Sequence, residues 1–316
     1  MAAPPRSVGG QHPCLICGPP LVLDEERTLR LEHLSEVDRP ALEALYGTLS
    51  RRDLQRRFFT SARPPSSFFD QWASVASRGG FDLGAFLDRN SHSTLAGEAG
   101  YALLADGDGE LGIAVDPASR GWLGPWLLDL LLRHAAERGV PNIQALVLVD
   151  NKAMMALAAR RRYAVLDHPD WGTVRLTMST QGTTPSWPRP HPRPRILVES
   201  ERPRWFAERE LREAGFDVAI CSGARVSTEY CPVLNGEPCP LVEGADAVIV
   251  ALPPDDPRTD ELITAQRVVH PATRLLAGFT SDLDGTQHRR SGSELLNDLD
   301  HLLPEDDSDQ GSSLSP

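Results

Sequence analysis

The chain has 316 residues but only one lysine, Lys152, although it carries 32 basic side chains in all. A Walker-type phosphate loop needs a lysine after its glycines, and no G-x-x-x-x-G-K-[ST] pattern can be formed here. An enzyme that binds its substrate as a Schiff base would have only Lys152 to use. The preference for arginine fits a compositional bias that also raises alanine, proline and glycine, and both exclusions hold.

Cysteine is scarce too. Five cysteines, an odd number in a chain of this length, favour a reducing compartment over a disulfide scaffold. Cys14 and Cys17 form a C-x-x-C pair that can supply half of a zinc site, but no second pair with this spacing follows. We therefore expect no metal site, and we interpret residues 1–26 as a flexible N-terminal arm.

Long apolar runs are missing. The longest, from Trp122 to Leu132, is interrupted by Pro125 and Asp129 and is too short to span a bilayer. The N-terminus lacks the apolar stretch of a signal peptide. A formal net charge of -12 disfavours binding to nucleic acid or anionic membranes. We therefore expect a cytoplasmic protein with no nucleic-acid or membrane partner.

The residues that are present predict two α/β domains. The first spans residues 27–180, a proline-rich linker covers 181–194, and a second, smaller domain covers 195–300. An acidic, serine-rich tail, 301–316, is predicted to be disordered. The absence of a G-x-S-x-G pattern disfavours hydrolase chemistry.

Several elements of the first domain can be predicted from periodicity and capping residues. A helix is expected to begin at Asp38, whose side chain would cap it, with Pro40 in the first turn. The strongest helix is expected at 124–138, with Pro125 in its first turn. A nearly continuous apolar strand at 142–149 is expected to be buried on both faces.

The passage from Glu110 to Gly124 is the most informative part of the chain. A predicted strand, 110–115, runs through a loop that contains Gly121 and enters the strongest helix. Backbone N–H groups clustered at such a junction suit the pyrophosphate of a nucleotide-containing cofactor. The alternative is a tight strand-to-helix turn that needs no ligand.

These residues resemble the GCN5-related N-acetyltransferase (GNAT) family over roughly residues 28–180. The resemblance is carried by Glu110-Leu-Gly-Ile-Ala-Val-Asp-Pro, by Arg120-Gly-Trp-Leu-Gly with its apolar helix, and by Asp150-Asn-Lys-Ala-Met-Met-Ala-Leu ending in Arg162-Tyr-Ala-Val. Leu49-Ser50 followed by Arg57-Phe58-Phe59 is similar to the opening helices of bacterial protein acetyltransferases. The resemblance implies the GNAT fold, a mostly antiparallel mixed sheet flanked by helices.

The resemblance also implies an acetyl-CoA site between two neighbouring strands. Arg120, Gly121 and Gly124 match the family's phosphate loop, in which the backbone of Gly121, Trp122, Leu123 and Gly124 would hold the pyrophosphate. Trp122 stands where a glycine is usual. Ile113 and Val115 lie on the strand that would pair with the pantetheine. Asn151 corresponds to an asparagine that contacts the cofactor arm, and it is also a good helix N-cap.

Acetyl transfer needs a base that deprotonates the acceptor amine. Glu110 occupies the position where the family commonly keeps its glutamate base, and Glu98 on the preceding strand is a second choice. The usual tyrosine acid would lie seven residues after Asn151, where this chain has Ala158. Tyr163 is interpreted as a packing residue.

The second domain resembles a flavodoxin-like or receiver unit. Glu199 and Glu201 follow its first strand, but Ala251 and Leu252 stand where a receiver has its aspartate, and the receiver lysine is missing. Cys231 and Cys239 are interpreted as inert thiols in surface loops. A regulatory or partner-binding role is expected for this domain.

The sequence thus predicts an acetyl-CoA-dependent N-acetyltransferase acting on an amine of a protein or small molecule, with an appended regulatory domain. The alternative is a catalytically degenerate GNAT fold that acts as a binding or sensing module. Trp122 and Ala158 are the features that favour the alternative.

Overall fold

The computed structural model describes residues 18–90, 92–161, 163–167, 172–187, 193–221, 231–281 and 287–303. The predictions that concern Cys14, Cys17, Arg162 and the tail from residue 304 fall outside these ranges. The chain forms two compact units, which are described separately. The first runs to Ala105 and takes in Gly109–Gly139, and the second takes in Asp106–Asp108 and the chain from Val140 on.

An antiparallel sheet forms the first unit's framework. Its strands follow one another in space in chain order: β1 (Leu21–Val22), β2 (Arg27–Glu32), β3 (Phe81–Arg89), β4 (His92–Leu103) and β5 (Gly109–Val115). Between β2 and β3 come η1 (Glu36–Asp38), α1 (Arg39–Thr48), α2 (Arg51–Phe58), α3 (Ser66–Ala73) and η2 (Ala76–Arg78). After β5 come η3 (Pro117–Ser119) and α4 (Arg120–Glu137).

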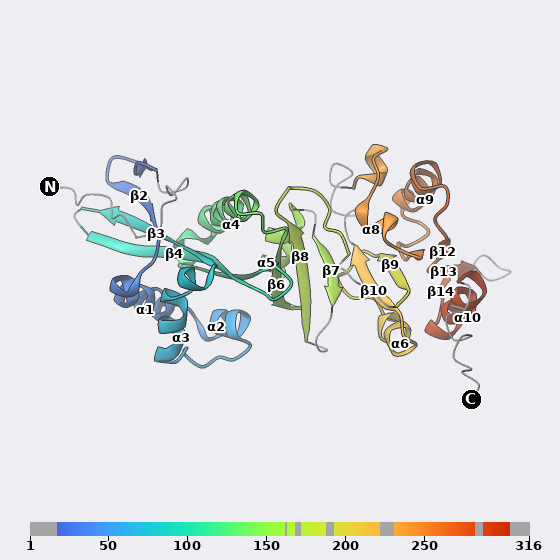
Figure 1. The fold of residues 1–316 in the computed structure, drawn as a ribbon, viewed down its shortest axis with the longest axis horizontal. Coiled ribbons are helices and arrows are strands. Elements are labelled where there is room, and N and C mark those ends of the chain that lie inside the picture. Colours follow the sequence, from blue (N-terminus) through green and yellow to red (C-terminus); the bar gives the residue numbers. More distant parts are fainter. Residues whose placement is uncertain are drawn as a thin grey trace, which may run out of the picture. The chain divides into compact units, whose positions relative to one another are not determined.

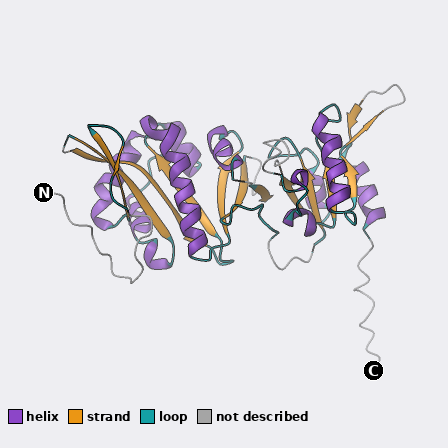
Figure 2. Ribbon diagram, turned by 90° about the horizontal axis from the view of Figure 1, so that it is seen from above, coloured by secondary structure: helices purple, strands orange, loops and turns teal. Residues whose placement is uncertain are grey.

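The helices of this unit cover both faces of its sheet (Figures 1 and 2). Helices α1–α3 lie on one side, where Leu42, Leu45, Tyr46 and Trp72 join a buried cluster with Ala114 of β5. On the other side lies α4, whose Leu123 and Leu127 pack against Gly97 of β4. The β4–β5 pair is therefore sandwiched between two helical layers.

Helix α1 begins where the sequence predicts, but Asp38 does not cap it. Asp38 stands at the N-cap position without a side-chain bond to the helix. Its carboxylate instead accepts hydrogen bonds from the backbone N–H and the hydroxyl of Ser35, at 3.0 and 2.7 Å. The side chain thus stabilises the preceding turn.

The strongest helix begins four residues earlier than expected. Helix α4 starts at Arg120, so Gly121 lies in its first turn and Pro125 lies inside it. Pro125 has no N–H and cannot donate to the carbonyl of Gly121. Glycine and proline often mark the ends of helices, so Gly121 and Pro125 led to a predicted start that is too late. The helix begins earlier because Leu123 and Leu127 are buried in the core and stabilise its first turns.

One sheet also runs through the second unit. Its strand order is β6 (Asn142–Leu148), β8 (Thr173–Ser179), β7 (Ala164–Asp167), β10 (Asp217–Cys221), β9 (Arg195–Glu199), β11 (Ala247–Val250) and β12 (Leu275–Ala277). Helix α5 (Lys152–Ala159) follows β6. Side chains of β6 alternate between buried and half-buried, so the expectation of burial on both faces is wrong.

Strand β7 joins the two predicted domains. It pairs antiparallel with β10, where Val165 lies opposite Ile220 and Ala164 opposite Cys221. Strands β10, β9, β11 and β12 then pair in parallel. In the predicted linker, Trp187 is buried and its indole N–H donates to the carbonyl of Leu241 at 2.7 Å. The sheet therefore continues across the predicted domain boundary.

The parallel part of this sheet has helices on both faces (Figure 1). The short helices η5 (Val233–Asn235) and α8 (Pro240–Glu243) lie with α9 (Pro257–Val269) on one side, and α6 (Glu208–Glu213) lies with α10 (Gly292–Leu302) on the other. A hairpin of β13 (Phe279–Ser281) and β14 (Gln287–Arg289) precedes α10. Of the helices described, none is both long and apolar enough to cross a membrane.

Cys231 and Cys239 are not in surface loops as predicted. Both side chains are buried in the core beneath α9, with Leu241, Val250 and Leu262. Burial raises the pKa of the Cys239 thiol to about 12, so this thiol is protonated at neutral pH. Cys239 is therefore expected to react slowly, as predicted, but because it is buried in the core and not because it lies in a surface loop.

Candidate active site

The β5–α4 junction forms the predicted phosphate loop. Asp116 begins η3 by accepting a hydrogen bond from the N–H of Ala118 at 3.0 Å, and α4 follows after Ser119. The first N–H groups of a helix have no acceptor within it, and here they belong to Arg120, Gly121 and Trp122. The N–H groups of Leu123 and Gly124 lie further inside the helix, where they point along its own hydrogen-bond ladder.

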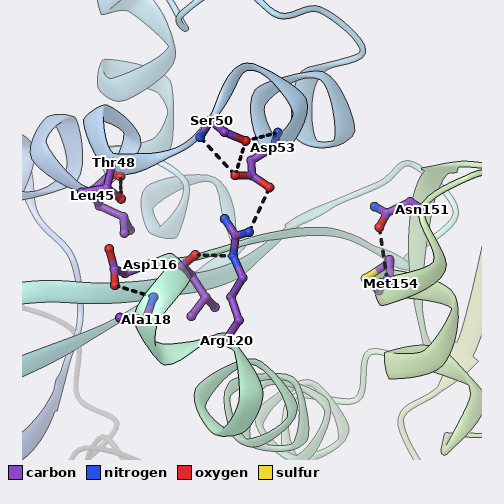
Figure 3. Close-up of polar contacts among 10 residues, drawn as sticks. Leu45, Thr48, Ser50, Asp53, Asp116, Ala118, Arg120, Asn151 and Met154 are labelled. Atoms are coloured by element: carbon purple, nitrogen blue, oxygen red, sulfur yellow. Dashed lines mark hydrogen bonds and ion pairs between the residues drawn. The ribbon is translucent and has the colours of Figure 1, made fainter.

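The Arg120 side chain ties this junction to α2 (Figure 3). Its Nη1 donates to Asp53 Oδ1 at 2.9 Å, and its Nε donates to the carbonyl of Val115 at 3.2 Å. Burial disfavours the charge of Asp53, but the hydrogen bonds from Arg120 and Ser50 outweigh it and lower the pKa of Asp53. Arg120 thus fixes the end of β5, while its backbone remains at the helix terminus.

The four residues from Gly121 to Gly124 differ in accessibility. Gly121 is exposed, and nothing lies within 4 Å of the place where a Cβ would stand. Trp122 is 42% exposed, whereas Leu123 is fully buried and Gly124 is buried. The side of the turn at Gly121 is therefore open, and the side at Leu123 belongs to the core.

Both candidate bases lie on one face of the β4–β5 pair. Glu98 lies opposite Ala114, Gly100 opposite Gly112, and Ala102 opposite Glu110. Directly opposed residues project from the same face, so Glu98 and Glu110 flank the two glycines. This is the face that carries Trp72, because a Cβ on Gly112 would stand 2.5 Å from its ring. Glu110 is exposed and Glu98 is fully buried.

Glu98 belongs to a buried polar cluster. Tyr46 donates its hydroxyl to Glu98 Oε1 at 2.7 Å. Burial raises the pKa of Glu98, and the attraction of Arg57 and the bond from Tyr46 oppose that rise. The other oxygen, Oε2, is buried and has no hydrogen-bond partner among the residues the structure describes.

Two further ionisable residues of this unit have shifted pKa values: Asp82 lies near Glu98, whereas His134 lies on α4, on the other side of the sheet. Asp82 on β3 is fully buried, and burial raises its pKa although His33 lies 3.8 Å from its Oδ1. His134 on α4 stacks on Phe81 with ring centroids 3.6 Å apart. Burial lowers the pKa of His134 to about 4, so the ring is neutral at pH 7.

Asn151 lies in the second unit and caps α5. Its side-chain oxygen accepts a hydrogen bond from the N–H of Met154 at 3.3 Å (Figure 3). This confirms the N-cap interpretation, and the contact with a cofactor stays a prediction. Ala158 is fully buried on α5, Tyr163 is buried after it, and Lys152 is exposed at the helix start.

A buried carboxyl also lies at the end of β9. Gln266 of α9 donates its amide to Glu199 Oε1 at 2.7 Å, and both side chains are buried. Glu199 Oε2 and Gln266 Oε1 have no hydrogen-bond partner in the described part of the chain. Burial raises the pKa of Glu199 to about 7. Within the same residues, no group of three or more His, Cys, Asp and Glu side chains is placed to hold a metal.

No sequence motif predicts the hydrogen bond from Tyr46 to Glu98 or the position of Arg57 over Gly112. Arg57 was noted only for its similarity to the opening helices of bacterial acetyltransferases. One signal was present: Gly100 and Gly112 both interrupt strand patterns, and glycine in a strand often marks a close approach of another group.

Comparison with known proteins gives a family for part of the chain. Residues 49–162 match the Acetyltransferase (GNAT) family model. The chain therefore contains a GNAT acetyltransferase domain. No curated protein matches the chain.

Solved structures that match about half of this chain come from several bacteria. The GNAT domain of PAT from S. lividans is 21% identical, with a TM-score of 0.43, and covers 48% of this chain and 90% of its own. Ribosomal-protein-alanine N-acetyltransferase from Brucella melitensis is 23% identical, with a TM-score of 0.39, and the match covers 47% of this chain and 98% of that one. A phosphinothricin acetyltransferase from Sinorhizobium meliloti, in complex with AcCoA, is 15% identical, with a TM-score of 0.40, and the match covers 48% of this chain and 88% of that one.

Proposed function

We propose that this protein transfers an acetyl group from acetyl-CoA to an amine on a protein or small molecule. The observation that carries the proposal is the match of residues 49–162 to the GNAT family, since this segment contains the β5–α4 junction and both candidate bases. Assignment to the bacterial protein-acetyltransferase branch rests on Leu49-Ser50 and Arg57-Phe58-Phe59 and is part of the proposal.

The first turn of α4 fits the pyrophosphate of acetyl-CoA. The N–H groups of Arg120, Gly121 and Trp122 lie at the positive end of an 18-residue helix. Gly121 has open space where a side chain would stand, so a phosphate can approach its backbone. Ile113 and Val115 would line the pantetheine through the backbone of β5, and Asn151 would contact the cofactor arm. Leu123 and Gly124 would support the turn from the core.

Glu110 is the better placed of the two bases. In the reaction the amine nitrogen bonds to the thioester carbonyl carbon, the carbon–sulfur bond breaks, and the amine loses a proton. An exposed carboxylate can take that proton directly or through water. Glu110 is exposed, whereas Glu98 is fully buried and accepts the hydroxyl hydrogen bond of Tyr46. Solvent would protonate the departing thiolate, because Ala158 offers no acid.

The C-terminal domain is proposed to be regulatory. Its parallel strands have the order β10-β9-β11-β12, which in chain order is 2-1-3-4, as in flavodoxin-like sheets. Ala251 and Leu252 leave no aspartate at the end of β11 for phosphorylation. A ligand or protein partner is therefore the proposed input.

Calorimetric titration with acetyl-CoA tests the proposal. Binding by the full chain is expected, together with release of CoA thiol when an amine acceptor is supplied. In Glu110→Gln, turnover should be lost while acetyl-CoA still binds. Turnover unchanged by this substitution would reject Glu110 as the base. No binding at millimolar acetyl-CoA would reject the proposed enzymatic function. The alternative, a catalytically degenerate GNAT fold that binds or senses a ligand, would then remain, although the family match does not favour it.

A further inference from the structure

We propose that Arg57 is a positioning residue of the acetyltransferase site, held over Gly112 so that one guanidinium group serves both Glu98 and Glu110. This inference rests on the proposed function and adds to it the counter-ion of the catalytic base. It concerns only residues of the first unit.

Arg57 occupies the space over Gly112, beside the ring of Trp72. A Cβ on Gly112 would stand 2.6 Å from an Arg57 Nη atom, so the guanidinium group lies directly over this glycine. Gly112 lies between Ala114, which faces Glu98, and Glu110, its neighbour on the same face of β5. The guanidinium therefore lies between the positions from which the two carboxylates project.

Aromatic rings fix the guanidinium in this place. It lies over the rings of Phe58, Phe68 and Trp72, with its central carbon 5.2, 6.0 and 5.8 Å from their centroids. These distances are within the range of cation–π attraction. Such a cage restricts a long side chain that would otherwise sample many conformations.

The charges agree with the geometry. Burial disfavours the Arg57 cation, but a hydrogen bond to Tyr46 and the attraction of Glu98 and Glu110 outweigh it and raise the pKa of Arg57. In return, Arg57 lowers the pKa of Glu98 against the effect of burial. Asp82 raises the pKa of Glu98 further, so Arg57 opposes both burial and a neighbouring carboxyl group.

The role in catalysis follows from this shared charge. The base must be ionised before the acceptor amine transfers its proton, and a neighbouring carboxylate opposes ionisation. Arg57 lowers the pKa of Glu98 against the effect of burial, and this keeps Glu98 from competing for the proton. The cage keeps the cation in place while leaving Glu110 open to the acceptor.

The test is an NMR titration of the full chain labelled with 13C at glutamate carboxyl carbons, with Glu98 assigned by its loss in Glu98→Gln. In Arg57→Gln the titration midpoint of Glu98 should rise by about one pH unit or more. Arg57→Lys should largely restore it, because it keeps the charge. Arg52→Gln, exposed on the same helix, is the matched control and should leave the midpoint unchanged. An unmoved midpoint in Arg57→Gln would overturn the inference.

A second variant tests the sharing of the charge and does not depend on Arg57→Gln being folded. Glu110 is exposed, so Glu110→Gln should fold, and the Glu98 midpoint should fall because Arg57 then serves Glu98 alone. An unchanged Glu98 midpoint would contradict a shared cation. Acetyl-CoA calorimetry separates the two claims: no binding by wild type overturns the proposed function, whereas binding with unmoved midpoints overturns this inference only.

Discussion

Gly100 and Gly112 lie directly opposite each other on β4 and β5, and the indole of Trp72 fills the space that their side chains would need. A Cβ on Gly100 would also stand 2.3 Å from the carbonyl oxygen of Phe81. The absence of two side chains therefore creates the place in which an aromatic ring and Arg57 rest on the sheet.

Gly112→Ala is expected to destabilise the first unit. The new methyl group would stand 2.5 Å from Trp72 and 2.6 Å from Arg57, so both must move. Overpacking of this kind costs about 1–3 kcal/mol. Urea unfolding followed by tryptophan fluorescence measures the loss. A free energy of unfolding equal to that of wild type would show that the gap is not tightly filled.

Gly121→Ala is expected to separate stability from cofactor binding. No atom lies within 4 Å of the new methyl group, and alanine is a better helix residue than glycine, so stability should not fall. Acetyl-CoA affinity should fall roughly tenfold, about 1.4 kcal/mol, if phosphate approaches this backbone. Thermal unfolding and calorimetry report the two effects. If this variant binds acetyl-CoA as tightly as the wild type does, the phosphate does not approach the backbone at Gly121.

Glu199 is expected to make the second unit less stable as the pH rises. Its pKa in the folded chain is about 7, above the ordinary 4.5, so the folded state holds a proton that the unfolded state has lost between these values. The contribution of Glu199 to stability is therefore complete below pH 4.5 and is lost as the pH rises through 7, by about 3 kcal/mol for a shift of this size. Protonated Glu199 carries an O–H donor, and among the described residues Gln266 Oε1 is a buried acceptor without a partner.

Glu199→Gln should remove this slope while keeping the amide contact with Gln266. Urea unfolding between pH 4.5 and 8 measures it, and exposed Glu261→Gln on α9 is the control, which should retain the slope. The low pKa of His134, about 4, gives a slope of opposite sign below pH 6.5, so the difference between variants is the quantity to compare. Identical pH profiles in wild type and Glu199→Gln would contradict the prediction.

Removing the chain after Trp187 is expected to prevent stable folding of the remaining chain, which contains the GNAT match at residues 49–162. The cut would leave β7 without its partner β10, and it would expose Ala164 and Trp187, which are buried against the C-terminal core. An unpaired strand edge beside apolar surface favours aggregation. Size-exclusion chromatography should show a single folded species for a chain ending at Leu303 and aggregates for one ending at Trp187. A monomeric, cooperatively folded short fragment would refute this.

Local signals predicted many elements but not their tertiary setting. Pro40 in the first turn of α1 and Asn151 at the start of α5 were predicted correctly, because capping depends on neighbouring residues. The early start of α4 was missed, since burial of Leu123 outweighs Gly121 and Pro125. Pairing of β7 with β10 joins residues about fifty positions apart, and no local pattern encodes it. The burial of Glu98 likewise depends on Tyr46, on a helix far away in sequence.

Lys152, exposed at the first position of α5, gives the chain an unusual practical property. Because it is the only lysine, a reagent directed at amines has one side chain to modify, apart from the terminal amine. A fluorophore attached there would report on a single known helix. If the protein acetylates lysines, its own labelling by acetyl-CoA can appear at one side chain only, so substrate screens by mass spectrometry would have almost no background from the enzyme.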